Sequence, residues 1–189
     1  FFGRKNEKGI VLQDIRSSKA IVEYLTRFHA EVATWKVGRA FAALKLRELD
    51  GVYGGELAGH YYFRDFYYSD SALMAASIVL QLLNEFKRNG MTMSQIIKAI
   101  SPYSNSGEIN FRIEKKQDAM EAVRNHFMRR QKPVSSMDFD GYRLDYNDFW
   151  INIRPSNTEP YLRFIAEAKS KKQLDDIIHE VTMIVEKFC

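Results

Sequence analysis

The chain has 189 residues, 46% hydrophobic and 28% charged, which is typical of one or two globular domains and excludes a disordered chain, a collagen-like fibre and a disulfide scaffold. The net charge of +4 is too small to indicate nucleic-acid binding by itself, and no segment approaches the ~18 apolar residues of a membrane helix. Cys189 is the only cysteine, which suits a reducing compartment, so we expect a cytoplasmic protein that binds neither membranes nor nucleic acid.

The first hundred residues alternate between strand and helix patterns. Apolar runs predict strands at 9–12 and 32–37, and apolar spacing predicts helices over 18–28, 39–48 and 71–88. Ser17 or Ser18 can cap the first helix, and Gly90 can end the last one. Strands separated by helices predict βαβ units with a mostly parallel sheet.

The last eighty residues follow a different pattern. Alternation predicts strands at 109–113, 141–146, 149–153 and 161–168, and helices are expected over 116–130 and from 171 to the end. Ser170 can cap the closing helix. Short polar turns between the strands favour an antiparallel meander, so we expect a domain boundary near residues 102–108.

The segment 154–160, RPSNTEP, lies between two of these strand patterns. The planar fork of Arg154 matches two oxygens of a phosphate, and a tight turn rich in Ser, Asn and Thr can present N–H groups to an anion. The two prolines reduce the ordering cost of such a site. The alternative is a surface turn whose polar side chains bond their own backbone.

The segment 54–60, GGELAGH, combines three glycines with one carboxylate and one imidazole. Glu56 offers two acceptor oxygens that suit neighbouring sugar hydroxyls, and the imidazole of His60 can donate or accept a hydrogen bond. The alternative is an ordinary loop with a capping Glu and a solvated His. The chain lacks both the G-x-x-x-x-G-K-[ST] and G-x-G-x-x-G nucleotide loops, and it lacks the H-E-x-x-H zinc motif.

In this order and at this separation, the two loops resemble those of the α-D-phosphohexomutase family, of the phosphomannomutase and phosphoglucomutase type. The segment 55–60, GELAGH, resembles the family's sugar-binding loop, GE-x-S-G-H. The segment 154–160 resembles its phosphate-binding loop, R-x-S-N-T-E-P. Segments 14–18 and 36–39 resemble elements beside the sugar-binding loop, so the resemblance covers nearly the whole chain.

The family has four domains, and this chain resembles the third and the fourth. The resemblance implies an α/β sugar-binding domain over residues 1–104, with a mixed sheet and helices. A smaller α+β domain with an antiparallel sheet is implied over residues 105–189. Because the sequence opens on Phe1 rather than Met, we expect a piece of a longer protein. The missing N-terminal domains of the same polypeptide are then its expected partner.

The resemblance implies that the complete enzyme is an intramolecular phosphotransferase. It would interconvert hexose 1-phosphate and hexose 6-phosphate through a 1,6-bisphosphate, and Leu57 favours glucose and mannose over glucosamine. The family's phosphoserine and Mg²⁺ ligands lie in its first two domains, and neither motif occurs here. Mg²⁺ and glucose 1,6-bisphosphate are therefore implied for the full enzyme, and we expect this chain alone to bind no metal and to be inactive.

The resemblance also implies roles for individual residues. Glu56, Ala58 and His60 would contact the sugar, although Ala58 replaces the usual serine and so removes one hydroxyl. His60 is a candidate acid or base, with loop ordering as the alternative. Arg16 and Arg39 are candidates for a second phosphate pole, with surface arginines as the alternative; Arg39 also stands where glucose and mannose mutases often have His. The residues implied to bind phosphate are Arg154, Ser156, Asn157 and Thr158.

Two other classes of function stay open at this point. The chain could be a non-catalytic module that binds a phosphosugar or a phosphorylated partner without turnover. Nucleic-acid binding is less well supported, because the aromatic residues occur at core periodicity and are not interleaved with Lys and Arg.

Overall fold

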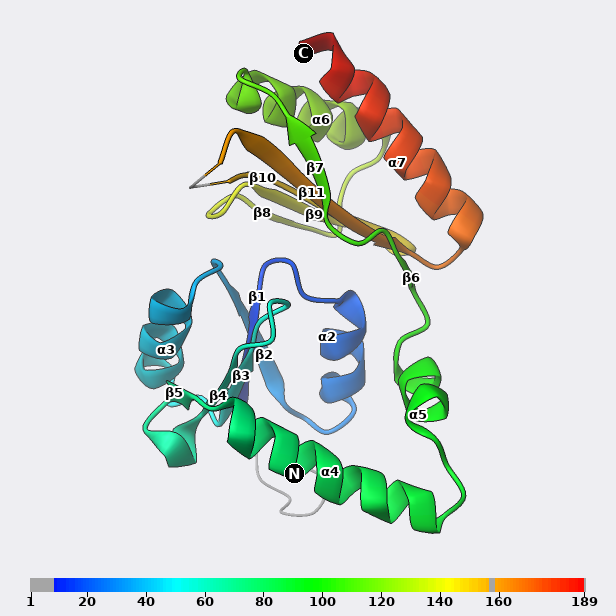
Figure 1. Ribbon diagram of the computed structural model, residues 1–189. Coiled ribbons are helices and arrows are strands. Elements are labelled where there is room, and N and C mark those ends of the chain that lie inside the picture. Colours follow the sequence, from blue (N-terminus) through cyan, green and yellow to red (C-terminus); the bar gives the residue numbers. More distant parts are fainter. Residues whose placement is uncertain (1–8, 157–158, 189) are drawn as a thin grey trace. The chain divides into compact units, whose positions relative to one another are not determined.

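The computed structural model describes residues 9–156 and 159–188, and Figure 1 shows its helices and strands. The chain divides into two compact units, residues 1–102 and 103–189. Each unit has its own sheet and its own hydrophobic core. Within the described residues, no helix combines the length and the apolar composition needed to cross a bilayer.

Unit 1 is built on a five-stranded mixed sheet. Its strands are β1 (Ile10–Asp14), β2 (Glu31–Trp35), β3 (Tyr53–Gly55), β4 (Tyr61–Phe63) and β5 (Ser69–Asp70), and its helices are α2 (Lys19–Thr26), α3 (Arg39–Glu48), α4 (Ala72–Arg88) and α5 (Met93–Ile100). The strand order is β2-β1-β3-β4-β5. β1 pairs in parallel with β2 and β3, whereas β4 pairs antiparallel with β3 and β5.

The expectation of a mostly parallel sheet is therefore wrong for the second half of this sheet. The five-residue loop 56–60 returns the chain directly beside β3, and so short a connection can join only antiparallel neighbours. The mixed sheet with helices that the family resemblance implied is confirmed.

Helices α2 and α3 lie on opposite faces of this sheet (Figure 1). Ala42 and Leu46 of α3 pack against Leu12 and Tyr62 of the sheet and form the buried centre of unit 1. The contacts of α3 extend across all five strands, whereas α2 contacts mainly β2, the strand at one edge.

Two helices of unit 1 begin at side-chain caps, of which Ser18 was predicted. The hydroxyl of Ser18 accepts a hydrogen bond from the N–H of Ala20 at the start of α2. Ser71 caps α4 in the same way, and Gly90, with φ +74°, follows the end of that helix. These contacts satisfy N–H groups that have no partner inside the helix.

Unit 2 is an antiparallel sheet covered by two helices. Its strands are β6 (Ser104–Asn105), β7 (Ile109–Arg112), β8 (Ser135–Met137), β9 (Tyr142–Asp145), β10 (Phe149–Pro155) and β11 (Tyr161–Ala168), and its helices are α6 (Lys116–Arg130) and α7 (Lys171–Val185). The strand order is β6-β11-β10-β9-β8, and β7 also pairs with β11. The predicted antiparallel meander is confirmed for β9, β10 and β11.

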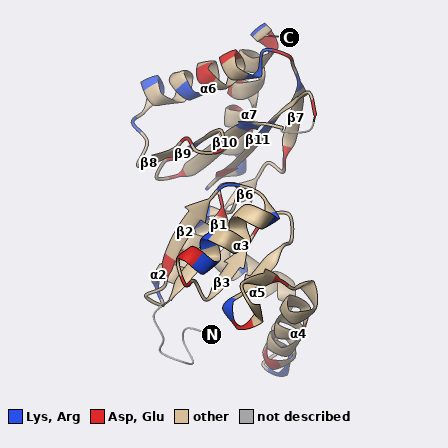
Figure 2. Ribbon diagram, turned by 90° about the vertical axis from the view of Figure 1, so that its left-hand side faces the viewer, with Lys and Arg blue, Asp and Glu red and all other residues tan. Residues whose placement is uncertain are grey.

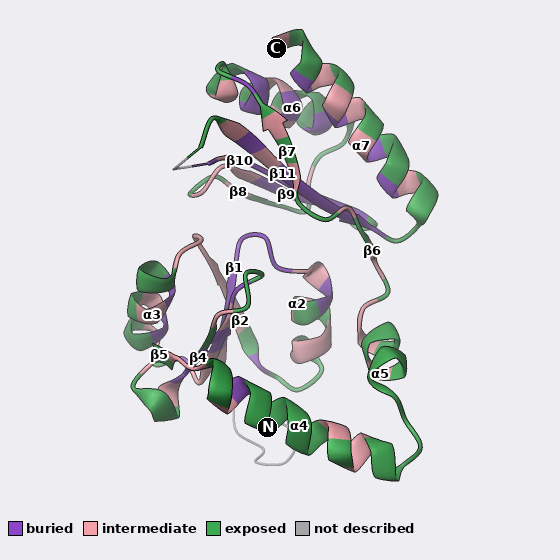
Figure 3. Cartoon of the chain, viewed as in Figure 1, coloured by how far each residue is buried: buried purple, intermediate pink, exposed green. Residues whose placement is uncertain are grey.

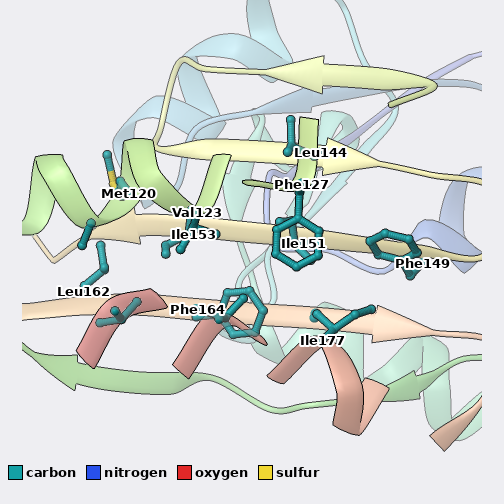
Figure 4. Packing of buried hydrophobic residues seen from close by; sticks show 14 of the residues in the cluster. Met120, Val123, Phe127, Leu144, Phe149, Ile151, Ile153, Leu162, Phe164 and Ile177 are labelled. Atoms are coloured by element: carbon teal, nitrogen blue, oxygen red, sulfur yellow. The ribbon is translucent and has the colours of Figure 1, made fainter. Parts of the chain in front are cut away.

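The core of unit 2 lies between the sheet and the helices α6 and α7. Figure 4 shows Phe127 of α6 and Ile177 of α7 directed at Ile151 and Phe164 of the two central strands. Figure 3 shows how strongly burial is concentrated in β10 and β11. Strand alternation sends every second side chain away from this core, and Arg154 is one of these.

Candidate functional site

A buried carboxylate organises the turn after β1. The Oδ1 atom of Asp14 accepts the N–H of Arg16 at 2.7 Å, and its Oδ2 atom accepts Nη2 of Arg16 at 2.7 Å. The hydroxyl of Ser17 donates to the same carboxylate. Asp14 and Arg16 are both buried, so the charge-assisted bonds between them are strong. Arg16, the predicted second-pole residue, therefore uses part of its guanidinium to hold this turn.

The same carboxylate anchors the loop 56–60. The N–H of Leu57 donates to Oδ2 of Asp14 at 3.0 Å. The loop also closes on itself, because the N–H of Glu56 donates to the carbonyl of His60 at 2.9 Å. Ala58 and the side chain of Leu57 are exposed at its tip. The backbone of the predicted sugar-binding loop is thus fixed to β1.

Glu56 is the buried residue of this loop. The hydroxyl of Tyr62 donates to its Oε1 atom, and the N–H of Gly38 donates to its Oε2 atom at 3.2 Å. Burial, together with the hydrogen bond and charge of Glu56, raises the pKa of Tyr62 well above its usual range, so Tyr62 stays a donor. Gly38 has φ +131°, a conformation that glycine adopts readily.

His60, the last residue of the loop, pairs with Asp70 of β5. Its Nδ1 atom lies 2.6 Å from Oδ2 of Asp70, and the imidazole is 41% exposed. Burial raises the pKa of Asp70, but the N–H of Tyr61 at 3.0 Å and the contact with His60 outweigh it and leave that pKa below its usual value. An ionised Asp70 favours a proton on Nδ1 and leaves Nε2 available for chemistry.

Arg39 is the first residue of α3 and is exposed. Its positive charge is close enough to act on the hydroxyl of Tyr62 and the carboxylate of Asp70. The structure therefore gathers the predicted residues Glu56, His60 and Arg39 at one end of the unit 1 sheet.

In unit 2, Arg154 lies on a strand. The sequence pattern ended the strand at residue 153, but β10 continues to Pro155, and Arg154 stands in register with Arg163 of β11. Arg154 is buried, with Nη1 3.8 Å from Oδ1 of Asp140. The residue that we predicted to bind phosphate is thus carried by the sheet, and its guanidinium lies beside Asp140.

Gly141 brings a neighbouring turn against the backbone of Arg154. Its φ is +70°, and an added Cβ would lie 2.3 Å from the carbonyl oxygen of Ile153 and 2.6 Å from Cα of Arg154. No side chain fits at that distance. The turn that carries Asp140 can therefore approach Arg154 only because residue 141 is a glycine.

The turn that follows β10 is closed by several backbone contacts. The N–H of Ser156 donates to the carbonyl of Tyr161 at 2.8 Å, and the N–H of Glu159 donates to the hydroxyl of Ser156 at 3.3 Å. Lys116 of α6 donates to the carbonyl of Glu159 at 2.7 Å. The predicted phosphate ligands Asn157 and Thr158 lie outside the described residues.

The described residues offer no ligand set for Mg²⁺. Within residues 9–156 and 159–188, His, Cys, Asp and Glu nowhere form a group of three or more that could hold a metal ion. These residues therefore do not fit the Mg²⁺ that the family resemblance implies for the full enzyme.

Several partners of the site residues were missed by the sequence analysis. Asp70, Tyr62 and Asp140 each contact a predicted residue through its side chain. Lys116 and Gly141 support the segment 154–160 from elements distant in the sequence. Tyr62 and Asp70 follow the loop closely in the sequence, so their short separation from it could have indicated that they contact Glu56 and His60.

Comparison with known proteins gives the family. The family model described as phosphoglucomutase/phosphomannomutase, alpha/beta/alpha domain III, matches residues 2–103. The model described as the phosphoglucomutase/phosphomannomutase C-terminal domain matches residues 108–183. A phosphomannomutase from Methanocaldococcus jannaschii is 32% identical over 177 residues, which is 94% of this chain and 38% of that protein.

Solved structures agree in fold. A phosphoglucomutase/phosphomannomutase family protein from Burkholderia thailandensis matches 97% of this chain with a TM-score of 0.78 at 21% identity. An N-acetylphosphoglucosamine mutase from Aspergillus fumigatus, in complex with glucose 1,6-bisphosphate, matches 97% of this chain with a TM-score of 0.67 at 15% identity. This chain covers 38% and 39% of those two chains. The chain therefore belongs to the α-D-phosphohexomutase family and corresponds to its domain III and its C-terminal domain.

Proposed function

We propose that this chain is the substrate-recognition half of a phosphohexomutase that interconverts hexose 1-phosphate and hexose 6-phosphate through a 1,6-bisphosphate. The observation that carries the proposal is the anchored loop 56–60: Tyr62 and Gly38 hold the buried carboxylate of Glu56, and Asp14 holds the N–H of Leu57. The phosphomannomutase relative and the phosphoglucomutase/phosphomannomutase family models favour mannose and glucose phosphates as the substrates. We infer that the reaction takes place in the reducing cytoplasm.

Unit 1 would grip the sugar. A carboxylate has about four acceptor positions, and Tyr62 and Gly38 use two of those on Glu56. The remaining positions suit two neighbouring hydroxyls, which are present in either orientation of the bisphosphate. His60, held at Nδ1 by Asp70, would direct Nε2 at the reacting oxygen as a general acid or base.

Unit 2 would hold the phosphate that is far from the reacting end. Arg154, on the rigid strand β10, offers a planar fork to two phosphate oxygens. Ser156, Asn157 and Thr158 would add donors from the turn. Arg39 would contribute positive charge at the other pole. Arg16, which lies beside Asp14, would contribute positive charge there as well.

The whole protein would supply the phosphoryl donor and the metal. The chain spans 38% of the length of the phosphomannomutase it matches, and its two matched segments are described as domain III and the C-terminal domain. The phosphoserine and the Mg²⁺ ligands would lie in the preceding domains, and glucose 1,6-bisphosphate would be the intermediate, as it is the ligand in the Aspergillus structure. The chain by itself would bind substrate without turnover.

The test is a titration of the chain with glucose 1,6-bisphosphate, followed through its amide NMR signals. Three or four charge-assisted bonds at ~1.5–3 kcal/mol each, less association costs of ~4 kcal/mol or more, give affinity in the millimolar range. We expect signals at Arg154 and Ser156 to shift in that range. Submicromolar binding by this chain alone would contradict the estimate, and shifts remote from both loops would contradict the site.

Matched variants make the titration specific. Arg154→Gln should abolish the shifts in the turn while its spectrum stays folded, whereas Arg129→Gln, at an exposed position of α6, should titrate like the parent. Turnover by the longer protein on glucose 1-phosphate and mannose 1-phosphate separates the enzyme from a non-catalytic phosphosugar-binding module, which would bind and not convert them.

A further inference from the structure

One face of the unit 1 sheet carries an open apolar groove. It has a volume of about 1000 Å³, and its floor is formed by Val11, Tyr53 and Phe63 of β1, β3 and β4. One wall is α2, and the other wall is α4. The opposite face of the sheet is covered by α3, which extends across all five strands. Helices therefore cover one face of the sheet fully and the other face only in part.

Helix α4 has the composition of a buried helix but is exposed (Figure 3). Its first thirteen residues carry no charge, and its two basic residues lie in the last turn (Figure 2). Ile78 and Val79, which line the groove, are each 41% exposed. A monomeric protein rarely leaves such a contiguous apolar surface open, so the surface indicates an interaction site.

The shape and chemistry of the groove suit a helix. Ala75, Ile78, Val79 and Leu82 follow the i, i+3, i+4, i+7 spacing of one helical face. Small residues at Ala20 of α2 and at Ala75 and Ala76 of α4 would allow a third helix to approach both walls. A helix laid over β1, β3 and β4 would complete the second helical layer.

The longer relatives indicate where such a helix comes from. The matched models are described as domain III and the C-terminal domain, so the remaining length of the M. jannaschii relative, of which this chain covers 38%, lies mainly on the N-terminal side. Val11, the second residue of β1, is part of the floor of the groove. Polypeptide upstream of this chain would therefore be tethered to a strand that forms part of the floor.

We propose that this groove holds an amphipathic helix of the same polypeptide, supplied from the segment that precedes β1. The helix would place an apolar stripe against α2, α4 and the sheet, and its polar side would face away from them. This proposal rests on the longer protein of the proposed function, but it assigns an interaction surface on unit 1 and not the substrate site.

The experiment measures maleimide labelling of single thiols in a Cys189→Ser background. Val79→Cys places the thiol in the groove, and Ser77→Cys is the matched control, because Ser77 is exposed on α4 and does not line the groove. Each variant is prepared in the chain 1–189 and in the natural protein with its upstream polypeptide. We expect the upstream polypeptide to slow labelling of the Val79→Cys thiol about tenfold or more and to leave the Ser77→Cys thiol unchanged.

Other results would overturn the proposal. Equal labelling of the Val79→Cys thiol with and without the upstream polypeptide would show that the groove stays open in the whole protein. Protection that rises with the concentration of the chain 1–189 would assign the groove to a second copy, and a gene that encodes nothing upstream would remove the occupant. In each case the phosphate titration at Arg154 could still succeed, so the two proposals fail independently.

Discussion

At the residue scale, Gly141 determines how closely the chain can approach Arg154. Replacement by Ala puts a Cβ within 2.6 Å of backbone atoms of residues 153 and 154, in a left-handed conformation. The clash and the unfavourable φ together should destabilise unit 2 by about 3 kcal/mol. Urea unfolding measures this loss directly. The titration with glucose 1,6-bisphosphate should weaken as well, because Arg154 must move.

Gly107→Ala is the control for this prediction. Gly107 has nearly the same φ, +66°, but an added Cβ would meet no atom of the described chain within 4 Å. Its cost should be about 1 kcal/mol, from conformation alone. If both variants lost the same stability, the close approach of Gly141 to Arg154 would be refuted.

The pair of Asp70 and His60 predicts a pH dependence of stability. Because the pKa of Asp70 is lowered in the folded state, its contribution is complete above the unfolded value of about 3.9 and disappears as the pH falls through the folded value. Asp70→Asn should therefore lower the stability of unit 1 by about 1 kcal/mol at pH 7, allowing for the partial exposure of the pair. The difference should shrink below pH 4.

Denaturant unfolding of parent and variant at a series of pH values checks this. Subtracting the variant's free energy of unfolding from that of the parent at each pH removes the contribution of the other carboxylates, because they titrate in both proteins. A difference that stays constant from pH 7 to pH 3 would show that Asp70 contributes through its shape and not through its charge.

At the element scale, the strongly periodic segments were predictable. Helices α3 and α6 have the predicted bounds, and the caps Ser18 and Ser170 were indicated by the sequence, because their side chains can satisfy the first N–H groups. The strands β3, β4, β5, β6 and β8 were missed because two or three residues cannot display an alternation. Helix α5 was missed although Thr92 and Gln95 form a capping box.

The candidate site was predictable only where it is local. Glu56 and Arg154 lie in compact motifs whose chemistry can be read from adjacent residues. The contacts that fix them come from other elements: Gly38 and Asp14 for the loop, and Gly141 for Arg154. Such contacts depend on strand order and register, which a single sequence does not specify.

The cap of α7 gives a prediction for an element. The hydroxyl of Ser170 accepts the N–H of Gln173 at 3.2 Å, and α7 supplies Leu174 and Ile177 to the core of unit 2. Ser170→Ala should destabilise unit 2 by about 1 kcal/mol, whereas Ser170→Asp keeps an acceptor and should cost little. Urea unfolding compares the three proteins. A loss of equal size in the Asp variant would show that the hydroxyl does not act as a cap.

At the scale of the whole molecule, the two separate cores predict two unfolding transitions. The chain has two tryptophans, Trp35 on β2 in unit 1 and Trp150 on β10 in unit 2. In a Trp35→Phe background the fluorescence therefore reports unit 2 alone. Leu46 and Leu174 are both fully buried, one in each core, so replacing either with Ala should cost about 2–5 kcal/mol in its own unit.

Leu174→Ala should therefore shift the fluorescence transition, which reports unit 2, to a lower urea concentration. Leu46→Ala should leave the fluorescence transition in place. It should shift only the part of the far-ultraviolet circular dichroism change that comes from unit 1. Unit 1 should unfold first, because its cluster of buried apolar residues is much the smaller and one face of its sheet carries the open groove. A helix in that groove would raise the first transition and not the second. A single transition moved equally by both substitutions would show that the two cores unfold as one cooperative unit.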